Sequence, residues 1–569
     1  MQVIIPMSGS GSRFARAGYT DPKPLIPVDG RPLIEHVIGM FPGVTDFVFV
    51  CSRAHLETTR LEAVLRRAAP TGRIVAIEPH KLGPVYATLQ AEALIRNDEP
   101  AIVNYCDFSV HWDFRDFCRT LHTLDPAGAL TAYRGFHPHS LGPNLYAYMR
   151  QENNRMLEIR EKYCFTEDRM NEFASSGTYY FRMGELLRHY FREAMLRNLT
   201  TNGEFYASMP YNLMVADGHP VHIYELEHFL QWGTPEDLEE YQRWSNFFAR
   251  RAEWEPNRRM PGAVLVPMAG DGVRFAREGY REPKPLVPVA GVPMIERALR
   301  TLPYSSRSIA ICRDSHLEAQ GPPDAAPENR GTTRSAVPGG RTCASSSNAS
   351  RLRIALDTAR PGVRVLPVGR RTEGQACTCL LAEGILDPAA PVLVAPCDSS
   401  VVYDEAALAA AIEADDADCI AFTFRNHPHA NRNPQQYGWL PTRGGSDICE
   451  KVLCKRAPEG PVTQARGIVG MFRFREARIM FEAIRKLMAR DQRVNGEFYL
   501  DSALGVLIDA GRTVRAFDVE HYICYGTPDD VRTYEYWEAY FTKNERHPYG
   551  KRSAQKEARH AAVYSPALL

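Results

Sequence analysis

The sequence has no net charge and no long apolar run. Its 569 residues include 68 Lys and Arg against 68 Asp and Glu. A balanced charge gives no global field that would recruit nucleic acid or an anionic membrane, although a local basic cleft is compatible with it. No 18-residue apolar stretch could span a bilayer, and no signal peptide follows Met1. We therefore expect a soluble, cytoplasmic protein that binds small molecules, with no nucleic acid partner and no membrane insertion, and homo-oligomerisation stays open.

Metal-ligand patterns of cysteine are also missing, although the chain has 13 cysteines. Cys377 and Cys379, like Cys449 and Cys454, lack the spacing and the accompanying His of a zinc site. Reduced thiols in a cytosol are the simpler interpretation.

The sequence does contain a glycine-rich motif that occurs twice. Residues 6–14 read PMSGSGSRF and lead to PKPL at 22–25, while residues 267–275 read PMAGDGVRF and lead to PKPL at 283–286. Each motif follows a short apolar run that predicts a buried strand, and the amides of a glycine-rich turn can bind phosphate oxygens. The sequence therefore predicts a duplicated nucleotide-binding domain.

Matching landmarks continue through both halves. Arg13 and Arg274 are 261 residues apart, whereas the two NGEFY segments, 202–206 and 495–499, are 293 apart. Most of the difference arises from residues 320–350, which are rich in Pro, Gly and Ser and cannot offset their own ordering entropy. We expect a surface loop or disorder there, and composition leaves open a lid or partner-binding role.

The landmarks also define the domains. We expect an N-terminal domain over 1–249, a linker over 250–261, a C-terminal domain over 262–542 and a polar tail over 543–569 that frays. Within each domain, apolar runs alternate with helical stretches, which predicts an α/β fold with helices on both faces of a sheet. In such sheets, ligands bind beyond the carboxyl ends of the strands.

The combination of GxGxR with PKPL ten residues later resembles the signature of sugar-phosphate nucleotidyltransferases, also called sugar-nucleotide pyrophosphorylases. The resemblance extends in order through Asp107, Gly177 and the GTP segment at 233–235, and it covers nearly all of both halves. It implies two tandem domains of the nucleotide-diphospho-sugar transferase type (GT-A or Rossmann-like), each with a mixed, mostly parallel sheet.

The reaction implied by the resemblance is attack by a phosphate oxygen of a phosphorylated metabolite on the α-phosphorus of a nucleoside triphosphate, with release of pyrophosphate. Such catalysis depends on positioning and charge neutralisation. The resemblance also implies specific roles. The catalytic cations would be Arg13, Lys23, Arg274 and Lys284. The nucleotide would be bound by Gly9, Ser10, Gly11, Ser12 and Gly83, and in the second half by Gly270, Gly272, Gly374 and Gln375. The acceptor would contact Glu161, Lys162, Gly177 and Glu204, and in the second half Glu450, Lys451, Gly470 and Glu497.

Each of these cations taken alone would equally suit a solvated surface position, and only the repeated spacing favours phosphate binding. The base-binding segments differ, because Pro84 lacks a backbone donor where Gln375 adds a side-chain amide. The sequence thus leaves open whether the halves bind different nucleotides or only one of them binds any.

Asp107 and Asp398 each end a predicted buried strand, a position that suits Mg²⁺ or Mn²⁺, although an Asp there can also cap a turn. Relatives usually carry a second metal-binding Asp two residues before the Gly of the GTP segment, where this chain has Gln231 and Cys524. The candidates for a replacement carboxylate are Glu227 with Glu520, or Glu204 with Glu497.

We therefore expect a nucleotidyltransferase that makes an activated precursor for surface glycan or capsule assembly. One alternative is a glycosyltransferase of the same fold, but neither Asp107 nor Asp398 belongs to the Asp-x-Asp pair that such an enzyme would carry. A second alternative is that one or both halves form a non-catalytic nucleotide-binding or regulatory module.

Overall fold

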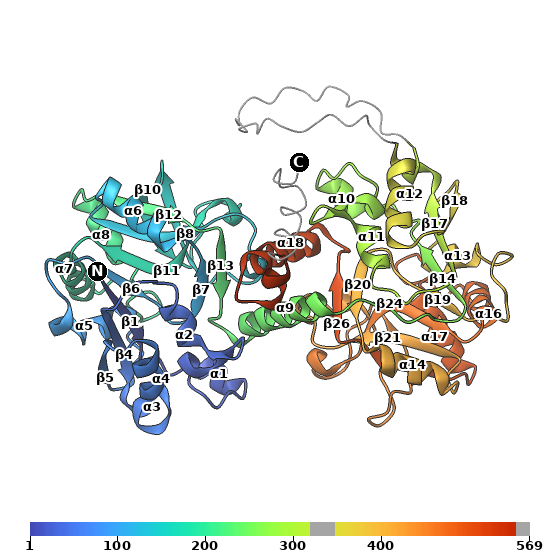
Figure 1. Cartoon of the computed structure of the whole chain (residues 1–569), viewed down its shortest axis with the longest axis horizontal. Coiled ribbons are helices and arrows are strands. Elements are labelled where there is room, and N and C mark those ends of the chain that lie inside the picture. The colour runs from blue at the N-terminus through green and yellow to red at the C-terminus, as the bar shows by residue number, and fades with distance from the viewer. Residues whose placement is uncertain (319–346, 554–569) are drawn as a thin grey trace, which may run out of the picture. The chain divides into compact units, whose positions relative to one another are not determined.

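The computed structural model of the chain describes residues 1–318 and 347–553. It divides into two compact units (Figure 1). Unit 1 contains Met1–Asn246 and the described residues from Ala539 on, and unit 2 contains Phe247–Glu538. The boundary lies inside helix α9 (Pro235–Glu253), so residues 250–253 of the expected linker are helical. No helix in the two described stretches is long and apolar enough to cross a membrane.

The expected insert at 320–350 lies outside the described residues except for its end. Ser347 accepts a hydrogen bond from the backbone N–H of Ser350 and caps helix α12 (Asn348–Ala359). The insert therefore ends at the start of a helix, as a serine N-cap predicts.

Unit 1 is built on a nine-stranded sheet with the order β5-β4-β1-β6-β11-β8-β12-β10-β9. Its strands are β1 (Gln2–Met7), β4 (Phe47–Ser52), β5 (Arg73–Ile77), β6 (Ala101–Asn104), β8 (Gly128–Tyr133), β9 (Ala147–Glu152), β10 (Arg155–Glu161), β11 (Phe173–Phe181) and β12 (Val221–Glu225). Strands β5, β4, β1 and β6 are parallel, whereas β11 runs antiparallel to both β6 and β8.

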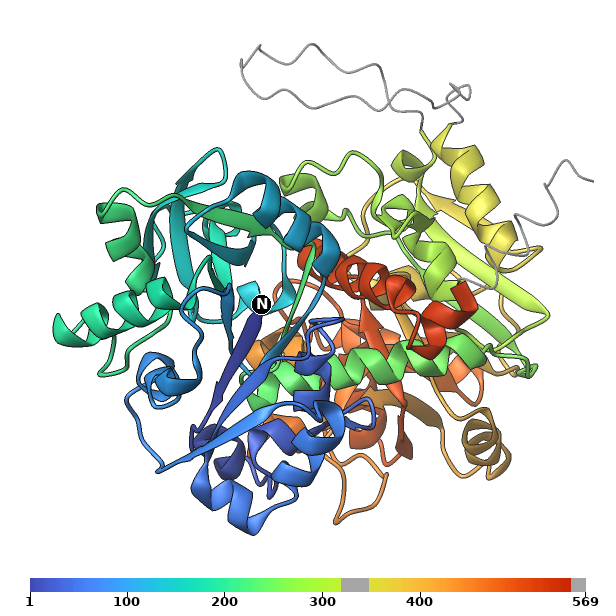
Figure 2. The same ribbon diagram turned by 60° about the vertical axis from the view of Figure 1, so that its left-hand side comes forward.

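Every residue of β1 and β4 is buried, so both faces of the sheet are covered. Helices lie on both sides of it (Figures 1 and 2). They are α1 (Ser12–Arg16), α2 (Leu33–Ile38), α3 (Arg53–Thr58), α4 (Leu61–Ala68), α5 (Pro84–Leu89), α6 (Phe114–Leu124), α7 (Gly184–Leu196) and α8 (Pro210–Ala216). A separate ribbon pairs β7 (Phe108–His111) with β13 (His228–Gln231), and the short strands β2 (Pro27–Val28) and β3 (Arg31–Pro32) pair with each other.

Unit 2 follows the same order of pairing, β18-β17-β14-β19-β24-β21-β25, with the short pair β22 and β23 attached to β24. Its strands are β14 (Ala263–Pro267), β17 (Arg307–Arg313), β18 (Arg364–Val368), β19 (Val392–Val394), β21 (Cys419–Phe424), β22 (Gly438–Trp439), β23 (Leu453–Cys454), β24 (Gly467–Phe474) and β25 (Val514–Asp518). Its ribbon pairs β20 (Ser399–Val402) with β26 (His521–Cys524), and β15 (Pro288–Val289) pairs with β16 (Val292–Pro293).

The helices of unit 2 are placed in the same sequence positions between strands. They are α10 (Val273–Arg277), α11 (Met294–Leu299), α12, α13 (Gln375–Leu380), α14 (Glu405–Glu413), α15 (Pro428–Arg432), α16 (Ala477–Ala489), α17 (Leu500–Asp509) and α18 (Pro528–Lys543). The expectation of mixed sheets flanked by helices is confirmed for both units.

The C-terminal segment packs into unit 1 beyond the end of α18. His547 is buried, and its ring centroid lies 4.5 Å from that of Phe541. Its Nε2 is 3.1 Å from the backbone oxygen of Ser245, while the N–H of Tyr549 donates to Nδ1. The beginning of the expected frayed tail is therefore ordered, and residues 554–569 lie outside the described part.

Candidate active site

The glycine-rich loop of unit 1 forms one wall of a cavity of about 480 Å³. Strand β1 ends at Met7, so the loop that follows lies at the carboxyl edge of the parallel strands. Gly11 makes the turn with a φ of 60°, a conformation that suits glycine. The cavity is lined by the predicted loop residues Gly9, Ser10, Gly11, Ser12 and Arg13.

Lys23 reaches the same cavity from the PKPL segment. Its Nζ donates to Oδ2 of Asp107 at 2.8 Å and to the backbone oxygen of Gly233 at 3.2 Å. Asp107 follows β6, so the contact joins two loops at one edge of the sheet. The structure thus brings together the loop, both predicted cations and the predicted metal carboxylate.

Unit 2 repeats this arrangement around a cavity of about 440 Å³. Lys284 donates to Asp398, and both line the cavity with Gly270 and Arg274. Burial lowers the pKa of Lys284, but the charge of Asp398 outweighs it and the pKa is raised. For Asp398, burial raises the pKa, but the ammonium group of Lys284 outweighs it and the pKa is lowered. Both groups are therefore held in their charged forms.

The two loops differ in charge. Where unit 1 has Ser10, unit 2 has Asp271, whose carboxylate is paired with Arg313 and lies 3.5 Å from Nη1 of Arg371. Gly272 completes the turn with a φ of 62°, and a Cβ there would lie 2.9 Å from Cβ of Lys284.

The predicted base-binding glycines sit in a tight backbone contact. Gly83 has a φ of 87°, and a Cβ on it would lie 2.8 Å from the backbone N and O of Phe205. Phe205 donates its N–H to Leu82 and accepts from Val85. Gly374, with a φ of 128°, makes the same contact with Phe498. This contact explains why the NGEFY segment recurs with the glycine.

The position where relatives carry a second metal-binding Asp lies beside the first carboxylate in both units. Gln231 in unit 1 and Cys524 in unit 2 line the cavities near Asp107 and Asp398. Among the described residues, no group of three or more His, Cys, Asp or Glu could hold a metal ion. A divalent cation at Asp107 or Asp398 would therefore need substrate oxygens and water to complete its coordination, which Mg²⁺ commonly uses.

Only one of the two expected pairs of replacement carboxylates lies at the cavities. Glu227 is paired with Lys543, and Glu520 pairs with Arg250 at 2.8 Å; neither lines a cavity. Glu204 and Glu497 do line the two cavities.

The predicted acceptor residues of unit 1 lie together. Glu161, Lys162 and Gly177 line the cavity. Ser208 donates a hydrogen bond to Glu161, and Lys162 Nζ lies 3.4 Å from the Tyr206 hydroxyl. Burial raises the pKa of Glu161 to about 7, although Ser208 and Lys162 oppose the shift.

In unit 2 the expected acceptor pair is not at the site. Glu450 and Lys451 do not line the cavity, although Gly470 does. Glu450 lies 3.7 Å from Arg443, and Lys451 lies 3.9 Å from Glu459.

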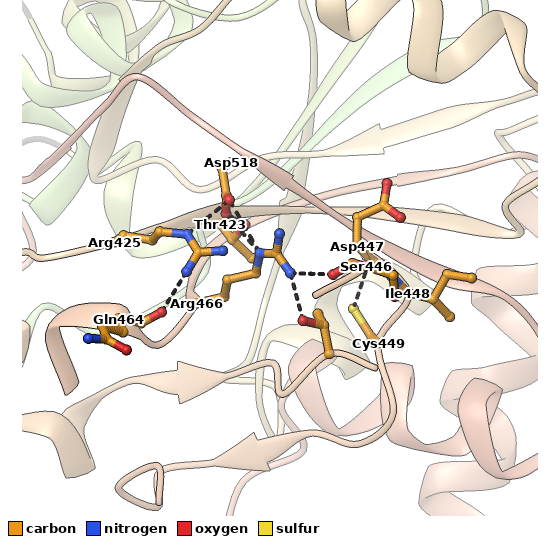
Figure 3. Close-up of polar contacts among 10 residues, drawn as sticks. Thr423, Arg425, Ser446, Asp447, Ile448, Cys449, Gln464, Arg466 and Asp518 are labelled. Carbon is orange, nitrogen blue, oxygen red and sulfur yellow. Dashed lines mark hydrogen bonds and ion pairs between the residues drawn. The ribbon is translucent and has the colours of Figure 1, made fainter. Parts of the chain in front are cut away.

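Glu450 and Lys451 belong to the connection between β22 and β23. Hydrogen bonds hold this connection in a position where the two side chains do not reach the cavity. Arg466 donates to the Ser446 backbone oxygen at 2.9 Å and to Thr442 at 2.7 Å (Figure 3). Its Nε lies 3.2 Å from Asp518, which also accepts from Arg425. The network holds this loop on the strands β21, β24 and β25.

Lys455, which the sequence analysis missed, occupies the position of Lys162. Both lysines have a left-handed backbone, with φ values of 53° and 55°. The N–H of Lys162 donates to the backbone oxygen of Tyr146, and that of Lys455 donates to Tyr437. Lys455 also lines the second cavity. The offset of 293 residues between the NGEFY segments, applied to Lys162, leads to Lys455.

Comparison with known proteins finds similar sequences for part of the chain. Residues 3–164 match the family described as the MobA-like NTP transferase domain. The Bifunctional protein GlmU of Cupriavidus necator is 32% identical over 108 residues, which are 19% of this chain and 22% of that protein. The Bifunctional protein GlmU of Bacillus mycoides is 25% identical over 233 residues, 40% and 47% of the two chains. The chain thus spans less than half the length of these relatives.

Solved structures that match part of this chain include a nucleoside-diphosphate-sugar pyrophosphorylase from Vibrio cholerae RC9. It is 20% identical, with 42% of this chain and 100% of that chain covered and a TM-score of 0.35. An inositol-1-phosphate CTP transferase from T. maritima is 18% identical, with 42% and 93% covered and a TM-score of 0.34.

Proposed function

We propose that this chain, whose residues 3–164 match the MobA-like NTP transferase domain, transfers a nucleotidyl group from a nucleoside triphosphate to a phosphorylated small molecule and releases pyrophosphate. The observation that carries the proposal is the convergence of the glycine-rich loop, Arg13 and the Lys23–Asp107 pair on one cavity. The same convergence around Lys284 and Asp398 supports two tandem copies of the site.

The chemistry follows from the charges. A phosphate oxygen of the acceptor forms a bond to the α-phosphorus, and the bond from that phosphorus to the oxygen bridging to the β-phosphorus breaks. Negative charge then grows on the leaving pyrophosphate. Arg13 and the loop amides would bind the leaving phosphates, and Lys23, oriented by Asp107, would neutralise charge near the α-phosphorus.

A divalent cation, when bound, would supply further neutralisation of the phosphate charge. Asp107 and Asp398 are the residues that would hold it. Because the described residues form no group of three or more metal-binding side chains, we propose that the ion binds with the nucleotide rather than before it.

We further propose that the product is an activated precursor for surface glycan or capsule assembly, made in the cytoplasm. The glycosyltransferase alternative has less support, because the described cavities hold a lysine against each strand-end Asp rather than an Asp-x-Asp pair. The regulatory-module alternative applies best to unit 2, where Asp271, paired with Arg313, stands in the phosphate loop at the position of Ser10.

The test is pyrophosphate release by the intact chain from each of the common nucleoside triphosphates, with Mg²⁺ and a panel of phosphorylated sugars, polyols and amino alcohols. Lys23→Ala and Lys284→Ala in the full chain would assign activity to a unit. Release that depends on one nucleotide and one acceptor supports the proposal. Nucleotide binding without release for any acceptor would favour the regulatory module.

A further inference from the structure

The pairing of strands shows which residues correspond between the two cavities at the end where the acceptor is proposed to bind. In unit 1, Glu161 pairs with Ala147 between β10 and β9. In unit 2, Cys454 pairs with Gly438 between β23 and β22. Because Lys162 and Lys455 follow these pairs with the same backbone hydrogen bond, Cys454 occupies the position of Glu161.

The carboxylate missing from that position appears on the opposite wall. Asp501 on α17 stands 293 residues after Ser208, the offset that also relates the NGEFY segments before them. Unit 1 therefore has Glu161 facing Ser208, whereas unit 2 has Cys454 and Asp501. The pair of facing positions thus carries a carboxylate in each unit, but on β10 in unit 1 and on α17 in unit 2.

A third exchange makes room for this arrangement. A Cβ on Gly438 would collide with Oδ2 of Asp501. The equivalent residue in unit 1 is Ala147, which is compatible with the short side chain of Ser208. Three positions thus differ together, as expected when a side chain is relocated within a packed site.

Asp501 is only 8% exposed, yet it lines the cavity. Within the part of the chain that the structure describes, its carboxylate accepts a hydrogen bond from its own backbone but none from a side chain, and Lys455 is the cation whose charge acts on it. Burial raises its pKa. A buried carboxylate without a side-chain donor is costly unless a ligand supplies one.

We propose that Asp501 is the carboxylate with which unit 2 binds its acceptor, and that the two units accept different phosphorylated molecules. This inference rests on the proposed function. Lys455 binds the acceptor phosphate, and Asp501 accepts hydrogen bonds from hydroxyl or amino groups of the acceptor. In unit 1, Glu161 receives such groups from the strand side, so an acceptor must present its donors in a different direction in each unit.

The direct test is hydrogen exchange of the full chain with glucose 1-phosphate, inositol 1-phosphate or glycerol 3-phosphate, each in the presence of non-hydrolysable nucleoside triphosphate analogues. We expect at least one probe to slow exchange at 453–456 and 499–502. Asp501→Asn, which keeps the shape of the side chain, should weaken that probe at least tenfold while protection at 160–163 stays unchanged. Asp509→Asn, exposed on the same helix, is the matched control.

A second variant retains the charge but moves it. Gly438→Ala should displace Asp501 and weaken the same probe. The triple variant Gly438→Ala, Cys454→Glu, Asp501→Ser should shift the acceptor ranking of unit 2 toward that of unit 1.

Protection at 453–456 that is unaffected by Asp501→Asn, or no protection by any probe, would overturn the inference. The proposed function is judged separately by pyrophosphate release. Asp501→Asn is also made in a protein that carries Lys23→Ala to silence unit 1. Release of pyrophosphate by that protein with an unchanged acceptor KM would refute the role of Asp501 and leave the proposed reaction intact. If instead an acceptor probe binds in a manner that depends on Asp501 but no pyrophosphate is released, the proposed reaction is refuted and the role of Asp501 in binding stands.

Discussion

The ammonium group of Lys23 lies 2.8 Å from Oδ2 of Asp107, although 84 residues separate them in the chain. Lys284 and Asp398 repeat the contact across 114 residues. In each unit the pair joins the loop after the first strand to the loop after a neighbouring parallel strand, and it fixes a cation on the cavity wall.

Replacing either lysine should abolish the activity of its own unit. We expect Lys23→Ala to lower pyrophosphate release from unit 1 about 10²–10³-fold, because a fixed charge at the transition state is removed. Thermal unfolding should change little, since the pair is partly exposed to solvent. The control is Lys551→Ala, because Lys551 is exposed. Lys81 is unsuitable as a control because it also lines the cavity. Equal loss in both variants would contradict the assignment.

Lys455 and Lys451 provide a matched pair in unit 2. Lys455 lines the cavity and Lys451 does not, so Lys455→Ala should raise the acceptor KM at least tenfold. Lys451→Ala should leave it unchanged. Initial rates with Lys23→Ala in the background measure unit 2 alone. A larger effect at Lys451 would restore the original prediction from the sequence.

The turn at Gly83 should not tolerate a side chain. Gly83→Ala combines a positive φ with a collision against the Phe205 backbone, and we expect a loss of about 3 kcal/mol in the stability of unit 1. Gly135 also has a positive φ but open space around it, so Gly135→Ala should lose only about 1 kcal/mol. Chemical denaturation of both variants compares them, and similar losses would show that the backbone contact is unimportant.

The stability of unit 1 should depend on pH through Glu161. Burial raises its pKa to about 7 in the folded protein, above the ordinary value of 4.5. Because the folded state holds this proton more tightly than the unfolded chain, the contribution is complete below pH 4.5 and is lost as the pH rises through 7. We expect up to about 3 kcal/mol between pH 4.5 and 8.

The measurement is the melting temperature of wild type and Glu161→Gln across this range. The variant should lose less stability than wild type as the pH rises. Glu152→Gln, an exposed change on β9, controls for the loss of a carboxyl group. Parallel curves for all three proteins would show that Glu161 titrates normally.

The C-terminal segment should stabilise unit 1. His547→Ala removes the contacts with Phe541 and Ser245, and we expect a loss of about 1–3 kcal/mol. Arg546→Ala, an exposed neighbour, should be neutral. Hydrogen exchange should locate the loss in unit 1, and an unchanged wild-type profile would mean that the segment contributes nothing. The contacts also argue for testing the units by point variants rather than by separating the halves.

The sequence alone determined the fold class and identified a glycine-rich loop, a lysine and an aspartate that line the cavity of each unit. Buried strands and the positive φ of Gly11, Gly83 and Gly374 are local requirements, so they leave a readable pattern of apolar runs and glycines. The repeat also related Lys23 to Lys284 and Asp107 to Asp398, because insertions did not alter the spacing around these motifs.

Only the tertiary structure decided the acceptor end. A two-residue match pointed to Glu450 and Lys451, but the loop that carries them is held by Arg466 away from the cavity. The sequence did not point to Asp501 for a different reason. The role proposed for Asp501 depends on Gly438 and Cys454, which are distant from it in sequence and lie near it only after the sheet forms. Contacts that depend on strand register and on space left by a missing side chain are decided by packing, and local sequence does not encode them.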